Sequence, residues 1–384
     1  MKKNLSSFLA KINRRTQSIA LPLTLTLSPA EREQPLAAHL KFESHQAEAS
    51  RGFTKKLGAF LPLRWGEGRG EGKGRVYFFK LPRLAGILSA ALMIIFPAHA
   101  KLNVVATTPD LAAIAREIGG DKIELTTLAK PTEDPHFVDA KPSFIVKLNR
   151  ADVLIEGGAE LEIGWLPALL DQSRNAKLAD GAPGRVACSQ GVSLLEVPAT
   201  LDRSKGDIHA AGNPHYVVDP VNAKIVAQNI AAALALNDAK DAEFFQAGLK
   251  KFDDAIDAKL IEWQATLAPF KNAPVVAYHN SWLYFANRFG LKIDLFLEPK
   301  PGIPPTPAHL AEVISKIKAQ NVRVIIVDPY LNRKTAETAA RSTGATVLDV
   351  TQFPGGLKGT EGGYIQLVDY LVNSIAGALG QKGH

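Results

Sequence analysis

The sequence predicts an α/β protein of two lobes, with a long helix between them and a ligand site in the cleft. Three observations support this prediction: short apolar runs alternate with helical patterns along residues 101–384, one helical pattern is much longer than the rest, and three histidines stand where polar turns begin. Apolar strands that alternate with helices are typical of parallel βαβ units. Open sheets of this kind bind ligands beyond the carboxyl ends of their strands.

Seven short segments are predicted to be strands. Several are rich in β-branched residues without alternation of polar and apolar positions, which indicates strands covered on both faces of a parallel sheet. The strands are expected at residues 102–107, 123–128, 153–155, 275–278, 293–297, 324–327 and 346–350. Between them, helices are expected at residues 110–119, 142–151, 307–319 and 334–342.

One segment breaks this rhythm. From residue 242 to 267 the chain has no proline and a single glycine, and apolar residues recur at steps of three and four: Phe245, Leu249, Phe252, Ile256, Leu260 and Trp263. Such a helix would run about 38 Å, long enough to bridge two lobes. It divides the chain into a first lobe (101–240), a linking helix (241–267) and a second lobe (268–384). The alternative is a long surface helix within one domain.

Residues 79–100 have the pattern of a signal peptide. Lys80 and Arg83 precede an apolar run over residues 84–96, and the small residues Ala98 and Ala100 follow it. A basic start, a short apolar run and a small-x-small end are typical of a cleaved secretory signal. The mature chain is therefore expected to begin at Lys101 and to be exported to the periplasm. The alternative is an uncleaved membrane anchor.

Residues 1–78 are expected to be a non-structured leader or the product of a mis-set start codon. No sustained period of 2 or 3.6 appears in the first 75 residues, and residues 61–72 are rich in glycine and charged side chains. Segments of this composition do not build a packed core.

The basic balance of the whole chain belongs to these first 100 residues. The net charge is +7 overall, but residues 101–384 hold only 29 of the 45 basic side chains and 32 of the 38 acidic ones, a net of −3. Without a basic surface the mature part is not expected to bind nucleic acid. The lone cysteine, Cys188, cannot form an intramolecular disulfide, so core burial must supply the stability.

Three histidines are candidates for metal ligands. His136 ends the run Glu133-Asp-Pro-His, His215 ends Asn213-Pro-His, and His279 directly follows the strand predicted at residues 275–278. Imidazoles displayed at element ends in an exported chain indicate a metal cage assembled from distant segments. Neutral imidazoles suit Zn²⁺, whereas the harder Mn²⁺ prefers carboxylate oxygen.

These motifs, taken in order, carry a family resemblance. The set is Asp134-Pro-His136, Asn213-Pro-His215, Tyr278-His-Asn-Ser-Trp282, Glu298-Pro-Lys-Pro-Gly-Ile-Pro304, Val327-Asp-Pro329 and Gly362-Gly-Tyr364. Behind a signal peptide and around a long helix, this order resembles the zinc- and manganese-binding periplasmic proteins of metal ABC transporters, the cluster A-I solute-binding family. The resemblance covers essentially all of residues 101–384.

The resemblance implies two pseudo-symmetric α/β lobes joined by a rigid helix, with a metal in the interlobe cleft. His136 and His215 would come from the first lobe and His279 from the second. The manganese branch of the family often has a glutamate in place of His279, so the histidine favours zinc over manganese. The implied partners are the divalent ion, an ABC permease and its ATPase, and the protein is expected to act as a monomer.

The fourth ligand is open. The family commonly supplies an aspartate after the last strand, but alignment back from Gly362 places Gln352 there. Asp349 is the nearest carboxylate and the first candidate, Glu361 is its rival, and a water molecule is the third option. His209 lies where zinc-binding members carry a histidine-rich loop, and a plain loop is favoured over an auxiliary site.

Several neighbours are candidates for a supporting role. Glu133 and Asp134 flank His136 and are placed to orient its second ring nitrogen, although both could be solvated loop acids. Asn280 is a candidate donor beside His279. Asp328 is interpreted as a turn residue rather than part of the cleft.

Two other function classes compete with a metal carrier. A zinc-dependent hydrolase with three histidines and a water is one, but the chain has no His-Glu-x-x-His helix and no nucleophile-elbow serine, so an enzyme is not expected. A metal-binding surface adhesin is the other. No lipid-anchoring cysteine follows the signal, which favours a soluble periplasmic protein.

Overall fold

The computed structural model describes residues 100–200, 206 and 209–381. The predicted leader, and the predicted signal peptide apart from Ala100, lie outside these residues. Within them, no helix has the length and apolar character needed to cross a membrane.

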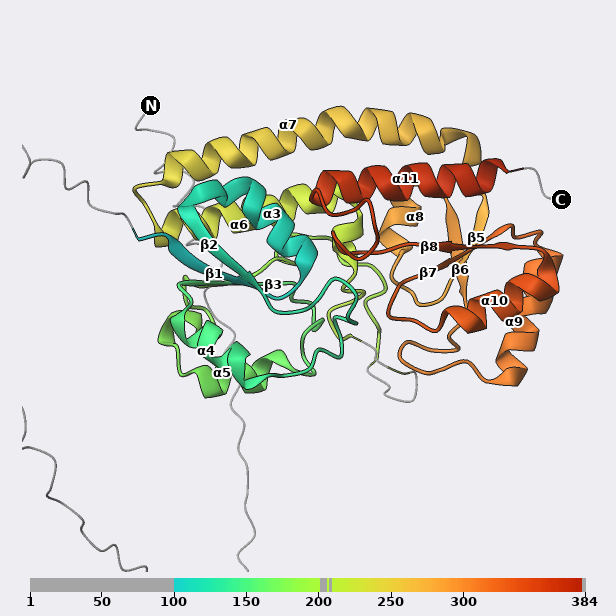
Figure 1. Cartoon of the computed structure of the whole chain (residues 1–384), viewed down its shortest axis with the longest axis horizontal. Helices are drawn as coiled ribbons and strands as arrows, with labels where there is room; N and C mark the ends of the chain where they lie inside the picture. Colours follow the sequence, from blue (N-terminus) through green and yellow to red (C-terminus); the bar gives the residue numbers. More distant parts are fainter. Residues whose placement is uncertain (1–99, 201–205, 207–208, 382–384) are drawn as a thin grey trace, which may run out of the picture. The chain divides into compact units, whose positions relative to one another are not determined.

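The first lobe contains a four-stranded parallel sheet in the order β2-β1-β3-β4 (Figure 1). Its strands are β1 (Leu102–Ala106), β2 (Ile123–Thr127), β3 (Val153–Glu156) and β4 (Arg185–Ala187). The central strand pairs Val104 with Leu125 on one side and Val105 with Leu154 on the other. The three-residue β4 was not predicted because one short run of this kind carries no periodicity.

The second lobe repeats this arrangement with the order β6-β5-β7-β8, also parallel. Its strands are β5 (Pro274–Ala277), β6 (Lys292–Phe296), β7 (Val324–Val327) and β8 (Thr346–Asp349). In both sheets the lobe's first strand lies between its second and third, so the lobes are pseudo-symmetric in topology. All seven predicted strands are present, with ends shifted by at most one residue, which confirms the predicted fold class.

Helices cover both faces of each sheet. In the first lobe they are α3 (Pro109–Gly119), α4 (Pro142–Arg150), α5 (Leu166–Ser173) and α6 (Pro220–Asn237), with short 3-10 turns at Gly120–Lys122, Ala176–Leu178 and Tyr216–Val218. In the second they are α8 (Leu283–Phe289), α9 (Pro307–Ala319), α10 (Arg333–Thr343) and α11 (Tyr364–Gly380), with a 3-10 turn at Ala268–Phe270. Neighbouring strand residues face opposite layers: Val104 packs toward α3 and α6, and Val105 toward α4 and α5.

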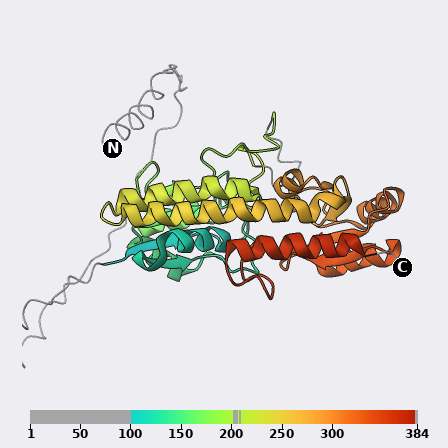
Figure 2. The same cartoon turned by 90° about the horizontal axis from the view of Figure 1, so that it is seen from above.

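The long helix α7 (Ala242–Leu267) has the limits predicted from the sequence. Its 26 residues correspond to about 39 Å, and its apolar stripe includes Phe245, Phe252, Ile256 and Trp263, all buried. The same apolar cluster contains residues of both sheets, so α7 covers one continuous core that serves both lobes. Figure 2 shows α7 running along the molecule with α11 beside it.

Further hydrogen bonds join the lobes. Arg288 of α8 forms a two-bond ion pair with Asp219 at the start of α6, with N···O distances of 2.7 and 2.9 Å. The Tyr284 hydroxyl donates to the Asn213 carbonyl at 2.7 Å. At the start of α11, the Tyr364 hydroxyl donates to the Val217 carbonyl of the first lobe at 2.6 Å. Polar contacts as well as the shared core therefore connect the two lobes.

Candidate metal centre

His136, His215 and His279 lie in loops that follow strands. His136 is in the connection from β2 to α4, His215 follows β4, and His279 comes two residues after the end of β5. Since the strands of each sheet are parallel, these loops leave at the carboxyl ends of the sheets. The positions agree with the rule that open α/β sheets bind ligands there.

His136 and His215 each lie in the same kind of turn, an Asx-Pro-His turn. In Asp134-Pro-His136 the backbone N–H of the histidine donates to the Asp134 carboxylate at 2.9 Å, and in Asn213-Pro-His215 it donates to the Asn213 side-chain oxygen at 3.1 Å. Aspartate and asparagine commonly bond to the backbone two residues ahead and so form a turn. The repeated Asx-Pro-His pattern therefore fixes the backbone beneath each imidazole.

The three imidazoles converge. One ring nitrogen from each lies within 4.8 Å of the other two, and Nε2 of His279 is 3.3 Å from Nε2 of His215. The ring centroids are 5.0 Å (His136–His215), 5.6 Å (His136–His279) and 5.3 Å (His215–His279) apart. Two imidazoles on one tetrahedral zinc, with Zn–N bonds of about 2.0–2.1 Å, have centroids about 5 Å apart. The triad therefore has the spacing that one ion requires.

The other nitrogen of each ring has a partner. Nδ1 of His136 lies 2.9 Å from the Asp134 carboxylate, Nδ1 of His279 lies 2.7 Å from the Glu298 carboxylate, and Nδ1 of His215 lies 2.9 Å from the Gln352 side-chain oxygen. These acceptors place the ring proton on Nδ1 and leave the lone pair on Nε2. All three Nε2 atoms are thus available to one cation.

Burial favours the neutral form of two imidazoles in this region, His215 and His209. Burial, followed by the neighbouring imidazoles, holds the pKa of His215 well below its usual value. Burial also lowers the pKa of His209 to about 4, with further contributions from His136 and His279. For Asp134 burial acts to raise the pKa, but the hydrogen bonds and charge of His136 outweigh it, so the pKa lies below its usual value. A neutral His215 imidazole and an anionic Asp134 carboxylate both favour a cation in the centre.

The structure does not bring Asp349 or Glu361 into this group. Asp349 ends β8 and accepts from Nε of Arg333 at 2.8 Å, while Glu361 is exposed and accepts from the Gly359 N–H at 2.8 Å. Gln352, three residues beyond β8, instead reaches His215. The prediction of Asp349 as the fourth ligand therefore has no support in this geometry, since its carboxylate binds Arg333 at the strand end and is not among the converging ligand atoms.

The supporting residues differ in part from expectation. Asp134 orients His136, whereas Glu133 accepts from the Lys130 N–H at 3.0 Å. Asn280 donates to Glu196 at 2.6 Å rather than to a histidine. Glu298 and Gln352 were not assigned a role from the sequence. The repeated Asx-Pro-His pattern gave no sign of them, because they lie 19 and 137 residues from the histidines that they contact.

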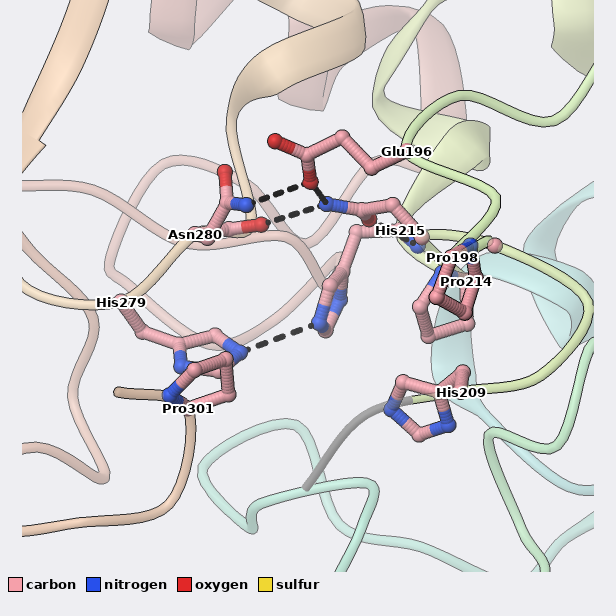
Figure 3. A pocket seen from close by; sticks show the side chains of 10 residues that line it. Glu196, Pro198, His209, Pro214, His215, His279, Asn280 and Pro301 are labelled. Atoms are coloured by element: carbon pink, nitrogen blue, oxygen red, sulfur yellow. Dashed lines mark hydrogen bonds between the residues drawn. The ribbon is translucent and has the colours of Figure 1, made fainter. Parts of the chain in front are cut away.

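A cavity of about 200 Å³ adjoins the triad (Figure 3). His215 and His279 line it together with a third imidazole, His209, and with the carboxylate of Glu196. The ring centroid of His209 is 5.2 Å from that of His136. The structure therefore places His209 beside the proposed metal centre, where a plain loop had been favoured.

Comparison with known proteins places this geometry in a family. Residues 104–378 match the family described as "ZnuA: Zinc-uptake complex component A periplasmic". The manganese ABC transporter substrate-binding lipoprotein PsaA of Streptococcus mitis is 25% identical over 287 residues, which are 73% of this chain and 89% of that protein. The iron ABC transporter substrate-binding lipoprotein MtsA of Streptococcus pyogenes serotype M1 is 26% identical over 253 residues, or 64% of this chain and 78% of that protein.

Solved structures share the fold. A crystal structure of ZnuA has a TM-score of 0.62 at 22% identity and covers 72% of this chain and 99% of its own. The Mn-bound periplasmic metal binding protein from Candidatus Liberibacter asiaticus has a TM-score of 0.60 at 20% identity and covers 73% and 100%. The family match is to a transport component, which confirms the prediction of a binding protein rather than an enzyme. Because that match runs through both lobes and all three converging histidines, the chain belongs to the ZnuA family of periplasmic metal-binding proteins of metal ABC transporters.

Proposed function

We propose that this protein captures zinc outside the cytoplasm and delivers it to an ABC permease. The observation that carries the choice of zinc is the donor set: one ring nitrogen from each of three histidines lies within 4.8 Å of the other two, and each Nδ1 has an acceptor. Imidazole nitrogen suits the borderline-soft Zn²⁺, while Mn²⁺ prefers oxygen. The carboxylates of Asp134 and Glu298 support the rings rather than face the ion.

The named relatives transport different metals. Proteins described as manganese, iron and zinc binders are all similar to this chain. The family likeness therefore supports a divalent metal as cargo, and the donor set of this chain supports zinc among them. His136, His215 and His279 are the proposed ligands.

We further propose that a signal peptide directs export of the chain and is cleaved after Ala100. The mature protein then works as a soluble monomer with a permease and its ATPase. The basic, apolar and small-residue pattern of residues 79–100 supports cleavage there. N-terminal sequencing of the protein purified from the periplasmic fraction should begin at Lys101. A start upstream of residue 79 would contradict this proposal.

Competitive calorimetric titration with Zn²⁺ and Mn²⁺ tests the metal assignment. One zinc ion should bind tightly and resist displacement by manganese. His279→Ala should weaken zinc binding by more than about 100-fold, since even outer-shell partners of a metal contribute about 10- to 100-fold. The matched control is His309→Ala at the start of α9, outside the triad, which should bind as the unaltered protein does.

Two results would contradict the proposal. Preference for manganese over zinc would show that the donor set does not decide the cargo. Zinc binding that is equally strong in His279→Ala would remove the triad as the site.

A further inference from the structure

The side-chain amide of Gln352 supports His215 as a ligand in only one of its two orientations. Its oxygen faces Nδ1 of His215 at 2.9 Å, and its nitrogen donates to the Tyr330 hydroxyl at 2.6 Å. A half-turn of the amide would exchange the two atoms, and the imidazole would then have to accept at Nδ1 and carry its proton on Nε2. That tautomer has no lone pair on Nε2 for a cation. The orientation of this amide therefore decides whether Nε2 of His215 can bind an ion.

Tyr330 alone does not fix this orientation. A phenol hydroxyl is both a donor and an acceptor, so it can accept from the amide nitrogen or donate to the amide oxygen. Both orientations of Gln352 would therefore satisfy the Tyr330 hydroxyl. A group that only accepts is needed to hold the amide nitrogen on the side away from His215.

Asp328 supplies a group of this kind. It directly follows β7, and although the sequence indicated only a turn residue, 2% of its surface is exposed. Its Oδ2 accepts from Nε1 of Trp282 at 3.2 Å. Its Oδ1 is also buried and forms no hydrogen bond of ordinary geometry within the described residues. The Gln352 amide is the neighbouring donor that favours the anionic form of this carboxyl group.

The charge state of Asp328 suits this role once an ion is bound. Burial raises its pKa to about 7, while donors on Trp282 and Gln352 and a positive charge on His279 act to lower it. A cation held by the His279 ring acts in the same direction as that charge. An ionised carboxylate accepts hydrogen bonds and donates none, so it disfavours the orientation in which the Gln352 oxygen would face it.

We propose that Asp328 is a positioning residue of the metal site, which acts through Gln352 and fixes the tautomer of His215. The inference rests on the proposed function and extends it to a residue that touches none of the three imidazoles. The other two rings of the triad have a carboxylate directly on Nδ1. His215 has a carboxylate as well, with the amide of Gln352 between the two groups.

Nitrogen-15 NMR of the metal-free protein tests the tautomer directly. At pH 8, above the pKa of Asp328, the chemical shifts of the two ring nitrogens report which one carries the proton. In the unaltered protein His215 should carry its proton on Nδ1. In Asp328→Asn both tautomers should be populated, because the asparagine amide can donate to the oxygen of a turned Gln352. The matched control is Asp294→Asn on the exposed side of β6, which should keep the Nδ1 form.

Zinc affinity gives a second test, which separates positioning from support of the fold. Asp328→Asn should lower the affinity by about 10-fold, the lower end of the range for outer-shell partners. In a Gln352→Glu background a carboxylate faces His215 directly, needs no second acceptor, and lies beside Asp328 as a like charge. There the same Asp328→Asn change should leave the zinc affinity unchanged or raise it. Calorimetric titration of the four proteins completes this double-mutant cycle.

The outcomes separate the two proposals. A His215 that carries its proton on Nδ1 alone in Asp328→Asn would overturn the role of Asp328, and so would an equal loss of zinc affinity from Asp328→Asn in both backgrounds. The NMR measurement needs no metal. Failure of the unaltered protein to bind zinc, with the tautomers as expected, would therefore overturn the proposed function but not the positioning of His215 through Gln352.

Discussion

At the residue scale, Gln352 is the neutral member of the three acceptors behind the imidazoles. Asp134 and Glu298 present carboxylates to His136 and His279, whereas His215 meets an amide oxygen. His215 is also the most buried of the three, with 6% of its surface exposed. The contact with Gln352 is therefore the hydrogen bond that orients this buried ring at Nδ1.

Truncation of this acceptor should weaken the site. In Gln352→Ala, Nδ1 of His215 loses its partner and the ring gains freedom, so zinc affinity should fall by about 10- to 100-fold. Calorimetric titration measures this, and Gln320→Ala, at the exposed residue that follows α9, is the control. Unchanged affinity in Gln352→Ala would mean that packing alone orients His215.

Asp110 gives a test of pH dependence at a buried carboxyl that lines a cavity together with His215 and Gln352. Burial raises its pKa from 3.8 to about 6, against the lowering effect of the Thr108 hydroxyl. The folded state thus holds this proton more tightly than the unfolded chain, so the contribution of Asp110 to stability is fully present below about pH 4 and is lost as the pH rises through about 6. Asparagine does not titrate, so Asp110→Asn should not lose stability as the pH rises through this range.

The stability of Asp110→Asn relative to the unaltered protein should therefore increase between pH 4 and pH 7, by up to about 3 kcal/mol. Urea unfolding midpoints at several pH values measure the difference. Parallel pH profiles for the two proteins would show that Asp110 titrates as it does in the unfolded chain.

The sequence singled out the three histidines that the structure brings together because the Asx-Pro-His turns and the strand end are local signals. Asp349 stays a prediction as the fourth ligand; its carboxylate accepts from Arg333, a tertiary contact that no local pattern indicated. The contact between Gln352 and His215 joins residues 137 positions apart. Local spacing in the sequence does not predict contacts between residues so far apart.

At the scale of elements, α7 illustrates what periodicity can and cannot predict. Its limits and its apolar stripe followed from the sequence, since steps of three and four over 26 residues have no strand interpretation. Gly248 is the single glycine of this segment. In the structure, a Cβ at this position would lie 2.5 Å from the Ile118 carbonyl oxygen, so the glycine lets α7 approach α3.

Gly248→Ala should accordingly destabilise the protein. Alanine favours a helix over glycine by about 1 kcal/mol, but the clash is with backbone that cannot move aside, and overpacking costs about 1–3 kcal/mol. Gly377→Ala in α11 is the matched control, because no atom lies within 4 Å of its added Cβ; it should be neutral or stabilising. Chemical unfolding of both variants measures their free energies of unfolding. An equal gain in stability in the two variants would contradict the close approach of α7 to α3.

At the scale of the whole molecule, the lobes share one core. A single apolar cluster contains strand residues of both sheets together with α3, α6, α7 and α11. The described part of the chain should therefore unfold in one cooperative transition. Zinc is proposed to bind across both lobes, so it should stabilise both of them in this single transition. At a zinc concentration 100 times the dissociation constant, the free energy of unfolding should rise by about 2.7 kcal/mol.

Differential scanning calorimetry with and without zinc checks this, and Mg²⁺ is the control ion. Removal of zinc by a chelator should return the transition to its starting temperature. Two separate transitions, only one of which responds to zinc, would contradict both the shared core and a site between the lobes.

The return of α11 to the first lobe has a consequence for how the protein is made. Tyr364, Leu367 and Val368 belong to the core that α3 and α7 also line, and the Tyr364 hydroxyl bonds to Val217. The ribosome completes these residues more than 100 positions after the first lobe's sheet has emerged. A partly synthesised chain therefore lacks one side of its first-lobe core, so this lobe cannot complete its packing until Tyr364, Leu367 and Val368 have been made.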